Sequence, residues 1–270
     1  NVKDNIVSVR FRILAAVLVL LFIHLCAASI AVHKKLLPAL IFLTSCIIIL
    51  RALSYKLPVP LNLRQLELFD PTVYGSNFIL RSLGDLLINS ILFVWVIIFI
   101  RLQLQEKKIR LTIGKPAAKW FFLALGVLII LSATFTAVHI IRSLIADSQI
   151  SFDVINFFSL NIYSVIGFVV LCCIAVGYYF LCQLLLFLLK PLFSAGFIEL
   201  YLFTTVMGLI LLSFNIGELG EGMELFSLGW LLVFLFFLNN SYLKIITSRI
   251  MSSKLVFWIF FFSVSMTVVI

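Results

Sequence analysis

Charged residues are scarce in this chain of 270 residues, where Asp, Glu, Lys and Arg together make up 11%. Soluble domains carry about 25% charged residues and are about 45–50% apolar, but 64% of this sequence is hydrophobic. This composition excludes a soluble globular domain and a disordered chain. It predicts a polytopic membrane protein whose first partner is the lipid bilayer.

Cysteine and histidine are also few. The five cysteines lie in apolar runs and none forms a C-x-x-C pair. Thiols buried in a bilayer behave as small hydrophobic groups, so we expect no disulfide scaffold, no metal site and no cofactor. Of the three histidines, His24 and His139 lie within apolar runs. Metal binding or pH sensing is open to each, but we favour a hydrogen bond to a neighbouring helix.

The apolar runs predict an all-α fold, a polytopic transmembrane helix bundle of about eight spans. Backbone polar groups in lipid must be paired internally, so only helices or closed barrels cross a membrane. Barrel strands alternate apolar and polar residues, whereas these runs are apolar on every side. The expected spans are residues 13–32, 36–50, 86–100, 120–141, a span within 155–189, then 194–214, 225–238 and a truncated run from residue 255.

The uncharged run at residues 155–189 is longer than a membrane requires. A straight helix of this length would measure about 52 Å, against an apolar core of about 30 Å. The run must therefore tilt, protrude or begin as an interfacial turn. Asn156 and Asn161 favour the interfacial start.

The distribution of positive charge predicts the orientation. Residues 101–119 carry six Lys and Arg against one acid, and positively charged loops remain cytoplasmic. With alternating spans, 12 Lys and Arg and one acid fall inside, while 8 Lys and Arg and nine acids fall outside. The net charge of +9 is thus a topology signal, and we expect no nucleic-acid partner.

The N-terminal Lys3, Arg10 and Arg12 disagree with this topology, because alternation places them outside. An upstream span would explain the disagreement. The last apolar run also stops at Ile270 without a closing charge, so we expect a segment of a longer protein with both ends of the segment outside. We interpret residues 1–270 as one transmembrane helical domain, with residues 52–85 as its interfacial or extracytoplasmic connector.

Residues 61–89 have the most informative local sequence. Asp70 before Pro71 is typical of a helix start, because Asp caps a helix and Pro suits its first position. Ser82 and Asp85 have the spacing of a capping box at the entry to a span. We expect one or two short interfacial helices on the outer face. A connector that packs against the bundle is the favoured interpretation, and ligand sensing or partner docking is the alternative.

This region resembles a known family. The string from Leu66 to Pro71, with Tyr74, Ser76 and residues 82–89, is similar to the membrane region of a group of bacterial sensor histidine kinases. The resemblance implies a sensory, signal-transmitting region of a two-component system in the bacterial inner membrane. An extracytoplasmic segment, a further span and a cytoplasmic kinase core would follow it. The candidate functional residues are Glu67, Asp70, Pro71, Tyr74, Asp85 and, within a predicted span, Glu199.

The segment itself lacks the catalytic parts of a kinase. None of His24, His33 and His139 is followed by the acidic residue of a phosphoacceptor site. The glycine-rich residues 217–222 contain acids that would repel phosphate. We expect no catalytic residue here, so a kinase activity and its response regulator would belong to the absent part. A homodimer is one assembly compatible with this function.

Glu199 is the single acid within a predicted span. It lies about 8 Å from the expected interface, so pairing with Lys190 or reaching the interface is favoured over ion coupling. Ion coupling would suit the alternative function, a secondary transporter or channel-like protein. That alternative predicts repeats and midplane polar groups, which the sequence hardly offers. A membrane enzyme acting on lipid-linked substrates would need a cluster of His, Asp or Arg, and no such cluster is visible.

Overall fold

The computed structural model describes residues 6–33, 36–56, 67–70, 74, 82–107, 116–146, 161–192, 197–213 and 221–245. Every regular element in these stretches is a helix, which confirms the all-α prediction. The chain divides into two compact units, residues 1–107 and 108–270, and each unit is described by itself. Their boundary falls within the basic segment 101–119. The interpretation as one transmembrane domain stays a prediction.

Five of the described helices are long and apolar enough to cross a membrane. They contain the apolar stretches Leu14–His33, Leu36–Ser54, Leu83–Leu104, Pro116–Ile145 and Ile162–Leu192. Two shorter apolar helices follow at Ile198–Ser213 and Leu225–Phe236. The helices thus indicate a multi-pass membrane protein in contact with lipid. The predicted run from residue 255 lies outside the described residues.

Helices α2 (Leu36–Lys56) and α3 (Leu83–Lys107) are longer than the predicted runs 36–50 and 86–100. Those runs were bounded by charged residues, but a backbone hydrogen-bond ladder does not end where a side chain is charged. Basic side chains at the end of a span extend toward the interface and keep their charge in water. With 21 and 25 residues, both helices reach the length of a membrane span.

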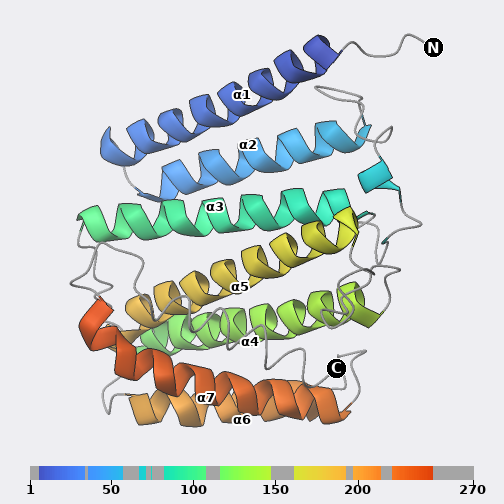
Figure 1. Cartoon of the computed structure of the whole chain (residues 1–270). Coiled ribbons are helices and arrows are strands. Elements are labelled where there is room, and N and C mark those ends of the chain that lie inside the picture. The colour runs from blue at the N-terminus through green and yellow to red at the C-terminus, as the bar shows by residue number, and fades with distance from the viewer. Residues whose placement is uncertain are drawn as a thin grey trace. The chain divides into compact units, whose positions relative to one another are not determined.

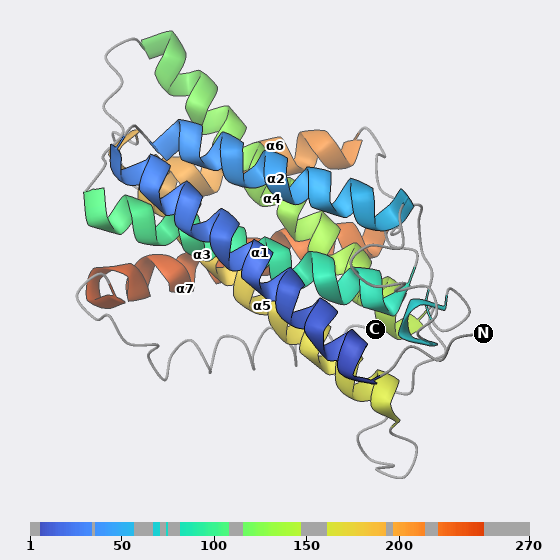
Figure 2. The same ribbon diagram turned by 90° about the horizontal axis from the view of Figure 1, so that it is seen from above.

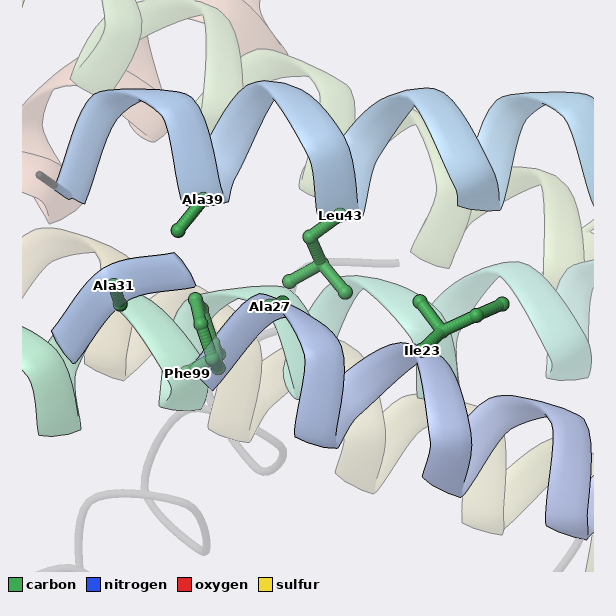
Figure 3. Close-up of a cluster of buried hydrophobic side chains, with 6 residues drawn as sticks. All are labelled: Ile23, Ala27, Ala31, Ala39, Leu43 and Phe99. Carbon is green, nitrogen blue, oxygen red and sulfur yellow. The ribbon is translucent and has the colours of Figure 1, made fainter. Parts of the chain in front are cut away.

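The first unit is built on small residues. Helices α1 (Ile6–His33) and α2 run antiparallel and pack side by side (Figures 1 and 2). Ala27 and Ala31 of α1 and Ala39 of α2 are fully buried. Small side chains let two membrane helices approach closely, which increases van der Waals contact. Figure 3 shows Ile23 and Leu43 beside these alanines, together with Phe99 from α3.

The second unit contains α4 (Pro116–Ala146), α5 (Ile162–Leu189), α6 (Phe197–Ser213) and α7 (Glu221–Ile245). Helix α4 packs against α5, α6 and α7, and α6 packs against α7. The 3-10 turn η4 (Lys190–Leu192) continues α5. Two close contacts are made at glycines. A Cβ atom on Gly126 would lie 2.7 Å from Cδ2 of Leu189, and one on Gly208 would lie 2.5 Å from Cδ1 of Leu228.

Helix α5 begins with a capping box. The side chain of Asn161 accepts a hydrogen bond from the backbone N–H of Ser164 at 2.9 Å, and Ser164 Oγ accepts one from the Asn161 N–H at 3.3 Å. Two donors at the helix start are thereby satisfied without water. Asn161 is therefore the cap of α5. The interfacial start that Asn156 and Asn161 suggested stays a prediction, and Asn156 lies outside the described residues.

A buried hydroxyl pair joins α4 to α5. Thr134 Oγ1 donates its only proton to the carbonyl of Ile130 at 2.8 Å. Its contact with Tyr178 Oη, also 2.8 Å, therefore has the tyrosine as the donor. The ring of Tyr178 also lies 5.5 Å from that of Phe234, so α7 completes the surroundings of this pair.

We expect Gly126→Ala to lower the free energy of unfolding by about 1–3 kcal/mol, because an overpacked contact must shift. Gly229→Ala is the matched control, since a Cβ atom on Gly229 would meet nothing within 4 Å. It should leave stability unchanged or raise it by up to about 1 kcal/mol, the helix propensity difference. Unfolding with dodecyl sulfate in mixed micelles, followed by circular dichroism, compares the two. Equal stabilities would contradict the close packing of α4 on α5.

We expect Thr134→Val to lower the free energy of unfolding by roughly 0.6–1.7 kcal/mol, the range measured for hydrogen bonds between membrane helices. The control is Thr205→Val, because Thr205 Oγ1 bonds to the Tyr201 carbonyl of its own helix. The same micelle assay should rank Thr134→Val below Thr205→Val. If the two variants unfold together, the hydroxyl pair does not join α4 to α5.

Candidate functional site

Asp85 stands in the first turn of α3 and helps to start that helix. Ser82 Oγ accepts a hydrogen bond from the Asp85 N–H at 3.2 Å and lies 3.0 Å from Asp85 Oδ2, to which it donates. The Leu86 N–H donates to the Ser82 carbonyl at 3.0 Å. The predicted cap is thus present, with the Asp85 carboxylate bound to the Ser82 hydroxyl. An acid in the first turn also suits the helix dipole.

The second carboxylate oxygen of Asp85 binds Arg51 near the end of α2. Arg51 Nη2 lies 3.0 Å from Asp85 Oδ1, and the two side chains are only 13% and 12% exposed. Arg51 Nη1 also donates to Ser54 Oγ at 3.4 Å. Removing water from two opposite charges strengthens their attraction but leaves either charge strongly unfavourable if its partner is lost. The ion pair therefore fixes the end of α2 against the start of α3.

The residues before α3 fold back onto its first turn. The 3-10 turn η2 (Glu67–Phe69) packs against α3. A Cβ atom on Gly84 would lie 2.7 Å from Cζ of the Phe69 ring, so only a glycine lets the ring approach this closely. Tyr74 is also buried, at 2% exposure. We call Phe69, Ser82, Gly84 and Asp85, together with Arg51, the α2–α3 cap.

The structure places the predicted site residues unevenly. Asp85 belongs to the cap, Tyr74 is buried, and Asp70 is exposed directly after η2. Glu67 is within η2, but its side chain is not described, and Pro71 lies outside the described residues. The helix start predicted at Asp70 and Pro71 is therefore untested. Glu199 is half-buried in the first turn of α6 and belongs to the second unit, so it is no part of the cap.

Arg51 is the cap residue that sequence reasoning missed. It appeared only as the charge that closes the short second run, 34 residues before its partner. The available signal was a single basic residue at the end of one span and a single acid at the start of the next. Where one span ends and the next begins, both helix ends lie on the same side of the membrane. Those two charges are therefore at the same depth.

A second polar contact within the first unit joins α1 to α3. The Trp95 indole N–H donates to Nδ1 of His24 at 3.1 Å. The ring of Phe99 lies 5.5 Å from the imidazole, edge to face. The favoured interpretation of His24, a hydrogen bond to a neighbouring helix, is confirmed. Among the described residues no group of three or more His, Cys, Asp and Glu side chains is placed to hold a metal ion.

Comparison of the chain with protein-family models, with curated proteins and with solved structures finds no match.

We expect Asp85→Asn to be the most damaging single change in the cap. It keeps an acceptor for Ser82 but removes the negative charge that pairs with Arg51, and breaking a buried ion pair costs about 3–5 kcal/mol. The double variant Arg51→Met/Asp85→Leu removes both charges and should recover most of that loss. Thermal unfolding of the purified protein in detergent measures all three forms. A double variant less stable than Asp85→Asn would show that the ion pair does not act as one unit.

Proposed function

We propose that this chain is the membrane sensory region of a bacterial sensor histidine kinase, a bundle of about eight spans in the inner membrane. One observation carries the proposal. The residues whose sequence resembles such proteins include Phe69, whose ring packs on Gly84, and Asp85, which forms a buried ion pair with Arg51 of the preceding helix. A role in sensing gives a reason for those residues to occur together, because an ion pair between two helix ends can be either formed or broken, which gives the contact two states.

The position of the cap suits signal transmission. The charge distribution places the ends of α2 and α3 that carry Arg51 and Asp85 on the outer side, and the basic end of α3 inside. Helix α3 has 25 residues and is about 37 Å long at 1.5 Å per residue. A signal that separates Arg51 from Asp85 at the outer end would therefore displace one rigid element that reaches the cytoplasmic side. Such a signal needs only a different affinity for the two states.

The chemistry of phosphotransfer would be supplied elsewhere in the protein. In the proposed arrangement this bundle binds no ATP and contacts no response regulator. A kinase core on the cytoplasmic side would do both. Pairs of kinase cores would also bring two copies of the bundle together, which makes the homodimer the assembly that we propose.

We expect the full-length gene product to contain a phosphoacceptor helix and an ATP-binding domain beyond residue 270. In inverted membrane vesicles it should incorporate radioactive phosphate from ATP. Asp85→Asn should change the rate of incorporation per molecule of full-length protein in the membrane at least several-fold. The conservative control is Thr205→Val, which lies outside the cap and should leave the rate unchanged.

A reading frame that ends without a kinase core would refute the proposal. So would a full-length kinase whose rate is the same with Asp85 and with Asn at that position. Uptake of a solute by proteoliposomes that contain only this chain would favour the transporter alternative instead.

A further inference from the structure

The Trp95–His24 contact fixes the protonation state of a histidine in the middle of a membrane helix. The indole nitrogen of Trp95 can only donate a hydrogen bond, and it lies 3.1 Å from Nδ1 of His24. Nδ1 must therefore be the acceptor, and the proton of the neutral ring is on Nε2. We propose that this contact is a proton-sensitive link, in which protonation of His24 releases Trp95 and loosens α1 from α3.

The chemistry of the two rings makes the bond and the proton mutually exclusive. A protonated imidazole carries a hydrogen on both nitrogens, so the Nδ1–H of His24 would face the N–H of Trp95 and neither could accept. The ring of Phe99, 5.5 Å from the imidazole, offers no acceptor in the plane of the bond. Protonation thus replaces an attractive contact with two opposed donors.

The charged groups on the surrounding helices give a protonated His24 little compensation. The nearest titratable or charged positions along each helix are Cys26 and His33 on α1, Cys46 and Arg51 on α2, and Asp85 and Arg101 on α3. Asp85 is the acid on these three helices whose side chain the structure describes, and it is bound to Arg51. It is also ten residues from Trp95 along α3, about 15 Å. A charged ring in apolar surroundings is unfavourable, so His24 is expected to move when it is protonated.

The sign of the pH effect follows from proton counting. The linked state binds fewer protons than the released state, so rising pH stabilises the link and falling pH weakens it. Helix α1 keeps its contact with α2, because Ala27, Ala31 and Ala39 do not titrate. The change is therefore expected between α1 and α3. This inference rests on the geometry of the first unit and not on the kinase proposal.

Fluorescence of Trp95 tests the link directly. The chain has four tryptophans, so the variant Trp120→Phe/Trp230→Phe/Trp258→Phe, reconstituted in lipid nanodiscs, reports on Trp95 alone. Between about pH 8 and about pH 5, where histidine changes its charge, we expect its emission maximum to shift, because the indole N–H of Trp95 loses its hydrogen-bond acceptor. His24→Gln provides an acceptor that cannot be protonated, and should abolish the pH response. His139→Gln is the matched control and should preserve it.

Electron paramagnetic resonance measures the loosening in a chain that keeps all its tryptophans. Spin labels attached to a ketone-bearing amino acid at Phe22 of α1 and Phe93 of α3, which are 66% and 39% exposed, avoid the native thiols. We expect the distance distribution to broaden or lengthen at low pH, and to stay constant in His24→Gln. Trp95 emission that does not depend on pH, an equal response in His24→Gln, or an unchanged spin-label distance would each overturn the inference.

Discussion

Lipid offers no hydrogen-bond partners, so each backbone polar group that this chain places in the membrane must find its partner within the protein. The backbone meets this constraint by forming helices. Thr44 and Thr205 meet it by bonding to carbonyls of their own helices. The remaining polar groups are few, and those with partners on other helices determine how the helices fit together. Apolar surfaces alone give little discrimination, because lipid tails are as apolar as leucine.

Three such contacts differ in strength and in what they can do. The Tyr178–Thr134 pair is neutral and buried. Its hydrogen bonds end at the backbone carbonyl of Ile130, so the pair contributes to helix packing. The His24–Trp95 bond is neutral only while His24 is unprotonated, which makes it sensitive to pH. The Arg51–Asp85 pair is charged in both partners, and the end of α2 and the start of α3 depend on it. A buried charge cannot lose its partner without a large rearrangement, so this pair is the contact best suited to a switch.

Much of the fold could be predicted because it follows from local chemistry. Apolar runs predicted the helices, and the Ser82 cap could be identified because its partner is three residues away. The partner of Asp85 could not be predicted in the same way, since a contact 34 residues apart depends on how two helices are placed. The close approach at Gly126 has the same origin, because nothing around that glycine in sequence indicates that Leu189 will pack on it. The predicted spans 36–50 and 86–100 are also shorter than helices α2 and α3, because each span was ended at a charged residue.

The account depends most directly on the Arg51–Asp85 contact in a lipid bilayer. Solid-state NMR can measure it by nitrogen–carbon dipolar dephasing between ¹⁵N-labelled arginine and ¹³C-labelled aspartate carboxyl groups in reconstituted protein. The account predicts strong dephasing of the Asp85 carboxyl signal, as expected for atoms in contact at an N–O distance of 3.0 Å, and its loss in Arg51→Met. A spectrum in which Arg51→Met leaves the dephasing of the Asp85 carboxyl unchanged, or in which that carboxyl does not dephase, would contradict the account.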